Sequence, residues 1–95
     1  MLNSKQKKQL RSLGNPLKPI FNVGKEGLSL NLISSLEDSL KAHELVKISV
    51  LKTAPNPVME LALDLASSTH SELIQVVGRS ILLYKQSEKR KIHLT

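Results

Sequence analysis

Two adjoining stretches of the sequence carry their hydrophobic residues at different spacings. Val46, Ile48 and Val50 recur at every second position, which places them on one face of a half-buried strand. A few residues later, apolar residues recur at three- and four-residue spacing, the period of an amphipathic helix. These positions are Val58, Leu61, Ala62, Leu65 and Ala66. A chain that changes period in this way packs helices on a sheet, and 95 residues allow one such domain.

The N-terminal half of the sequence predicts a helix, a strand and a second helix. Ser4 is the expected N-cap of a short polar helix over Lys5–Leu13, and Gly14 is its expected left-handed stop. A branched and aromatic run over Pro19–Val23 predicts a strand. Ser29 then caps a helix with an apolar stripe. The stripe consists of Leu32, Ile33, Leu36 and Leu40.

The C-terminal half predicts a third helix followed by a hairpin. Asn56 is the expected N-cap of this helix, with Pro57 in its first position, where a missing N–H costs little. Two apolar runs, Leu73–Val77 and Ile81–Tyr84, flank Gly78. A glycine between two such runs supplies the positive φ of a tight turn, so the runs should pair antiparallel.

The predicted order is helix, strand, helix, strand, helix, strand, strand. It indicates a single compact αβαβαββ domain of the α/β class over residues 1–95, with a four-stranded mixed sheet. The last strand is apolar on both faces, so we expect the first helix to cover the face that the other helices leave open. Residues 86–95 are interpreted as a basic tail, with Ile92 and Leu94 as possible tethers.

Charge is the first indication of function. Fourteen Lys and Arg against eight Asp and Glu give a net charge of +6, which attracts polyanions and makes nucleic acid the leading partner. Aromatic residues make up only 2% of the chain, too few for a base-stacking platform. We therefore expect contact with the nucleic-acid backbone.

Several function classes have no support in the sequence. Cysteine is absent, and the three His residues lie far apart, so we expect no metal and no cofactor. No nucleophile elbow and no Walker-type loop is present, and we expect a protein that is not an enzyme. No apolar run approaches the roughly 20 residues of a membrane span. We expect a cytoplasmic monomer that does not bind membranes.

A short glycine-flanked segment, Gly24-Lys25-Glu26-Gly27, lies between a predicted strand and a predicted helix. Without a Cβ at either end, the main chain could approach a sugar-phosphate backbone, and Lys25 would add a cation. The alternative is that both glycines only provide turn geometry. Glu26 works against phosphate binding, and the pattern alone leaves both interpretations open.

The order of elements and several short motifs together resemble the CRM domain family in its stand-alone bacterial, YhbY-like form. The resemblance covers residues 4–94. The motifs are Leu17-Lys18-Pro19, Gly24-Lys25-Glu26-Gly27-Leu28-Ser29, His43-Glu44-Leu45-Val46-Lys47-Ile48, Val76-Val77-Gly78-Arg79 and Leu82-Leu83-Tyr84-Lys85. One departure follows Thr69, where relatives tend to carry a glycine and this chain has His70. This departure leaves the shape of that turn open.

The resemblance implies a fold similar to the C-terminal domain of translation initiation factor 3, with a KH-like GxxG loop that contacts RNA. It also implies a role on precursors of the large ribosomal subunit. The implied loop contacts are Gly24, Lys25 and Gly27, and the implied flanking basic surface consists of Lys5, Lys7, Lys8, Arg11 and Lys18.

Two functions of different classes remain open. The first is an RNA-binding protein that assists ribosome assembly by contacting structured, large-subunit ribosomal RNA. The second is a basic protein-interaction adaptor associated with ribosomal particles, for which the hairpin and the tail would matter more. Lys47 could contact RNA or only begin a strand, and Tyr84 could stack on a base, although a packed ring is the favoured interpretation.

Overall fold

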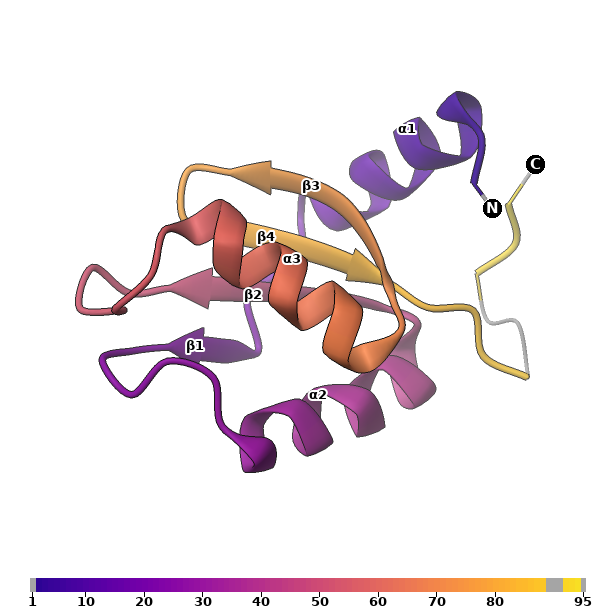
Figure 1. The fold of residues 1–95 in the computed structure, drawn as a ribbon. Coiled ribbons are helices and arrows are strands. Elements are labelled where there is room, and N and C mark those ends of the chain that lie inside the picture. Colours follow the sequence, from indigo (N-terminus) through magenta and orange to yellow (C-terminus); the bar gives the residue numbers. More distant parts are fainter. Residues whose placement is uncertain (1, 89–91, 95) are drawn as a thin grey trace.

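The computed structural model describes residues 2–88 and 92–94 of the chain. Across these residues the elements follow the predicted αβαβαββ order (Figure 1). They are α1 (Ser4–Gly14), β1 (Phe21–Val23), α2 (Leu30–His43), β2 (Leu45–Val50), α3 (Val58–Thr69), β3 (Glu72–Val77) and β4 (Ser80–Tyr84). The predicted α/β class is confirmed.

The four strands form one mixed sheet in the order β1-β2-β4-β3. β1 runs parallel to β2, whereas β4 runs antiparallel to both of its neighbours, as predicted for the hairpin. β1 is shorter than the predicted Pro19–Val23 and pairs only with Ile48–Val50. Just before β1, Ile20 donates its N–H to the carbonyl of Lys47 at 3.0 Å.

Each face of the sheet has its own hydrophobic core. α2 and α3 cover one face, and α1 with the C-terminal segment covers the other (Figure 1). β4 serves both cores, because Ile81 and Leu83 face α2 and α3 while Leu82 and Tyr84 lie in the core under α1. The expected cover of the second face by the first helix is confirmed.

Gly14 is not the left-handed stop that the sequence suggested. It belongs to α1, is buried, and its φ is not positive. A Cβ on this residue would lie 2.4 Å from Cδ2 of Leu82. The glycine lets the end of the helix approach the sheet closely. The C-cap of α1 is Asn15, whose N–H donates to the carbonyl of Arg11.

Two predicted helix caps are each shifted by one residue. Asn3, not Ser4, caps α1, because its side chain accepts from the N–H of Gln6 while the Gln6 side chain accepts from Asn3, forming a capping box. Pro57, not Asn56, is the N-cap of α3, and the Asn56 amide instead donates to Glu60 at 2.9 Å. Ser29 caps α2 as predicted, accepting from the N–H of Leu32.

A buried carboxylate holds the C-terminal segment. Glu44 is 0% exposed, and its side chain accepts from the N–H of Ser87 at 2.6 Å, from Ser87 Oγ at 2.9 Å and from the N–H of Ile92 at 2.6 Å. Ile92 and Leu94 pack against the core under α1, as predicted. Residues 89–91 and 95 of the predicted tail lie outside the described residues.

Candidate functional site

The segment Gly24–Gly27 forms a tight turn at one end of the sheet. The N–H of Gly27 donates to the carbonyl of Gly24 at 2.9 Å, and Lys25 and Glu26 at the corners are exposed. The turn follows the carboxyl end of β1 and precedes the cap of α2 at Ser29. The backbone bend predicted from the sequence is therefore present and accessible to solvent.

The two glycines of this turn have different structural requirements. Gly27 has a φ of 67°, which favours glycine, and a Cβ there would lie 3.2 Å from Pro55 Cγ. A Cβ on Gly24 would lie 3.6 Å from Leu51 Cδ1, which is ordinary contact. Turn geometry thus accounts for Gly27, whereas neither conformation nor internal packing requires a glycine at position 24. An absent side chain at Gly24 leaves the turn open to a molecule outside it.

Two further turns meet this one. Leu51 donates its N–H to Val23 at 2.8 Å and accepts from Ala54, which places Lys52 at the corner of the β2–α3 turn. Arg79, in the β3–β4 turn, accepts from the N–H of Val50 at 2.7 Å and donates from Nη1 to the carbonyl of Leu51 at 3.3 Å. We call this part of the molecule, with Lys25, Lys52 and Arg79 on three separate turns, the three-loop end.

Lys52 and Arg79 were not among the residues predicted for the site. The topology contains the signal that could have found them, because the carboxyl ends of two parallel strands meet at one edge of a sheet. The start of β4 lies beside the end of β2, since these strands are antiparallel. Only the pairing of the strands reveals this, since the three cations are far apart in the sequence.

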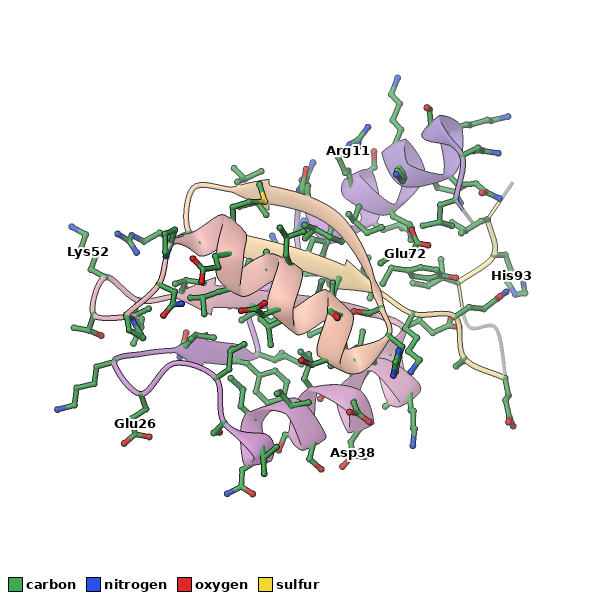
Figure 2. The ribbon with its side chains drawn as sticks, viewed as in Figure 1. Arg11, Glu26, Asp38, Lys52, Glu72 and His93 are labelled. Atoms are coloured by element: carbon green, nitrogen blue, oxygen red, sulfur yellow. The ribbon has the colours of Figure 1, made fainter. Side chains whose placement is uncertain are left out.

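The three-loop end is predominantly cationic. Lys25, Lys52 and Arg79 are exposed, and Glu26 is the acidic residue of the same turns. Figure 2 shows Glu26 pointing away from the turn that carries Lys52. The carboxylate therefore does not stand between the cations, and an extended polyanion can contact them together.

The basic residues of α1 lie elsewhere. Gln9 donates to the carbonyl of His93 and Leu2 packs near Tyr84, which places the first turns of α1 beside the C-terminal segment. Leu45 and Tyr84 pair at the end of the sheet opposite Val50, six residues or about 17 Å along β2. We call Lys5, Lys7, Lys8 and Arg11 the α1 surface. The structure does not bring it together with Gly24–Gly27, and Figure 2 shows Arg11 far from Lys52.

Lys18, the remaining predicted site residue, is exposed in the segment between α1 and β1, apart from both surfaces. Lys47 donates from Nζ to the carbonyl of Asn15 at 3.3 Å and so supports that segment. Tyr84 is only 4% exposed and packs in the core under α1, as favoured.

Within residues 2–88 and 92–94, no three His, Asp or Glu side chains are close enough together to hold a metal ion. No helix in these ranges has the length and apolar character needed to cross a bilayer.

The comparisons with known proteins agree on one family. The model of the CRS1/YhbY (CRM) domain matches residues 2–85. The chain is 42% identical to YqeI of Bacillus subtilis, named a probable RNA-binding protein, over 96% of this chain and 95% of that one. It is 32% identical to PA4753 of Pseudomonas aeruginosa, named likewise, over 99% and 90% of the two chains.

Structural similarity gives the same result. The solution structure of SAV1595 from Staphylococcus aureus superimposes with a TM-score of 0.83 at 43% identity, and the match covers 100% of both chains. The family model, the sequence relatives and this structure all extend over both cores and the three-loop end. The chain belongs to the CRS1/YhbY (CRM) domain family.

Proposed function

We propose that this protein binds structured RNA through the sugar-phosphate backbone, with the three-loop end as its principal contact. The observation that carries the proposal is that three turns with exposed cations meet at one end of the sheet, and that one of them is the glycine-flanked bend. Phosphate contacts use exposed cations and close access to the main chain, and this end offers both. The names of the relatives support the same class of partner.

The proposed target is ribosomal RNA of the large subunit or its precursor particle, and the proposed role is that of an assembly factor. The protein would act by binding in the cytoplasm, without a chemical step. The α1 surface would provide a second set of phosphate contacts, separate from the first. Both cores lie between these surfaces, so the RNA contacts can be changed without disturbing the packing.

A salt titration tests the contact surface. Replacing Lys25, Lys52 and Arg79 with alanine should make the negative slope of log affinity against log salt shallower by about 2–3, because each lost phosphate contact removes about 0.7–0.9. Lys41→Ala, an exposed lysine on α2, is the control and should leave the affinity nearly unchanged. An unchanged slope in the triple variant would exclude the three-loop end as the RNA contact.

Sedimentation of cell extracts tests the proposed target. The protein should travel with precursors of the large subunit and leave them after ribonuclease treatment. The triple alanine variant should remain at the top of the gradient. If the wild-type protein travelled with finished ribosomes or with the small subunit, the proposed assembly role would be wrong, whereas RNA binding itself would still stand.

A further inference from the structure

An apolar groove lies at the β1 edge of the sheet, near the start of β1 and away from the three-loop end. It has a volume of about 400 Å³. Part of its apolar wall comes from the end of α1 and the segment that leads to β1, where Leu13, Leu17 and Ile20 are 44%, 39% and 53% exposed. Single exposed apolar residues are ordinary, but three that line one groove indicate a surface that is covered in use.

The backbone beside this groove is an open strand edge. β1 pairs with Ile48–Val50, so in the described ranges no strand lies next to Leu45–Lys47 on that side of β2 (Figure 1). The incoming segment closes the edge at one point, where Ile20 donates its N–H to the carbonyl of Lys47 at 3.0 Å. An added strand could continue the sheet from Leu45 outward by main-chain hydrogen bonds.

The charge around the groove selects the partner. Lys18 and Lys47 are among the residues that line it, and the described lining includes no Asp or Glu. Lys47 uses one of its three donors on Asn15, which leaves donors for a carboxylate. A matching ligand therefore combines aliphatic side chains with acidic ones.

The lining also argues for a peptide over a nucleobase. Bases bind single-strand sites by stacking on aromatic rings or arginine planes. The described lining offers one such ring, His43, and no Phe, Tyr, Trp or Arg, and its apolar members are Leu, Ile and Val. Aliphatic walls beside an open strand edge suit an extended peptide, whose alternate side chains enter the groove while its main chain pairs with the strand.

We propose that this groove is a docking site for a protein partner, which contributes an extended segment with alternating aliphatic and acidic residues. The segment adds to the edge of β2 at Leu45 and places carboxylates near Lys18 and Lys47. The site lies apart from the three-loop end, so peptide and RNA can be bound at the same time.

Selection from a displayed library of random decapeptides on the full-length, ribonuclease-treated protein tests the proposal. Enriched peptides should alternate aliphatic and acidic residues. The affinity of these peptides should fall about tenfold or more for Ile20→Ser and likewise for Lys18→Glu. A tenfold fall corresponds to about 1.4 kcal/mol of binding free energy. Lys25→Ala is the control on the three-loop end and should bind the same peptides within a factor of two.

Amide spectra of the labelled protein locate the binding and check that each variant is folded. Adding an enriched peptide should shift the signals of Leu17, Ile20 and Leu45 while leaving Gly24–Gly27 unchanged. The proposal is overturned if no peptides are enriched, or if enriched peptides bind Ile20→Ser as well as the wild type. It is also overturned if a uridine decamer, and no peptide, shifts the groove signals, because the occupant would then be RNA.

Discussion

At the scale of single residues, Gly14 marks the closest approach of α1 to the sheet. Gly14→Ala would place its Cβ 2.4 Å from the buried Leu82 side chain, so one of the two elements must move. Overpacking costs about 1–3 kcal/mol, and the better helix propensity of alanine returns about 1 kcal/mol. We expect the free energy of unfolding to fall, by up to about 2 kcal/mol, in urea titrations.

The same substitution in a Leu82→Ala protein tests whether steric contact with Leu82 causes the loss of stability. In a Leu82→Ala protein the space beside Gly14 is vacant, so adding Gly14→Ala should no longer destabilise the protein. If the cost of Gly14→Ala were the same in both backgrounds, contact with Leu82 would not be its cause.

His70 shows the opposite case, a side chain where glycine would fit better. It ends α3 in the left-handed conformation, with φ 53° and ψ 41°, the shape that the resemblance associates with glycine. His70→Gly removes about 1–2 kcal/mol of strain from the left-handed backbone. It also destabilises the folded state by about 0.5–1 kcal/mol, because glycine increases the conformational entropy of the unfolded chain. We expect Tm to rise by about 4 °C in calorimetry. His70→Ala keeps the Cβ and should give no such rise.

At the scale of elements, the Glu44 carboxylate connects the end of α2 to the C-terminal segment. Ser87 and Ile92 donate to different oxygens of Glu44, so Glu44→Gln would keep one acceptor and turn an amide NH₂ toward the other N–H donor. Breaking a buried, charged hydrogen-bond set costs about 3 kcal/mol, and the loss should fall on the segment it holds. We expect hydrogen exchange at the Ile92 amide to become much faster while β4 amides change less.

Ser87→Ala is the matched control, because it removes only the hydroxyl donor at 2.9 Å and keeps the backbone bonds. Its cost should be about 1 kcal/mol, with the Ile92 amide still protected. Equal protection of Ile92 in Glu44→Gln and in the wild type would show that the carboxylate does not hold the segment.

At the scale of the whole molecule, the two cationic surfaces lie on different parts of the fold. Sites that share no partners contribute independently to binding. Neutralising the α1 surface and the three-loop end together should therefore lower RNA affinity by the sum of the separate losses, within about 0.5 kcal/mol. Filter-binding titrations at one salt concentration measure this. A coupling energy well above that value would show that the surfaces bind as one site.

The sequence by itself determined the order of elements and the two cores. Alternation in β2 and the helical stripe in α3 encode which side chains are buried, because local periodicity decides which face a residue occupies. It also supplied the exposed bend at Gly24–Gly27 and the tethers Ile92 and Leu94. The caps were off by one residue, since neighbouring Asn, Ser and Pro residues compete for one position.

Only the tertiary structure decided which charges act together. Lys25, Lys52 and Arg79 meet because β1 is parallel to β2 and β4 is antiparallel to it, and this pairing is not written in the spacing of the residues. The packing of α1 on the second face of the sheet places the α1 surface away from the three-loop end and brings Gly14 close to Leu82. Periodicity fixes a residue's face within its own element, whereas a binding surface depends on how separate elements are placed against one another.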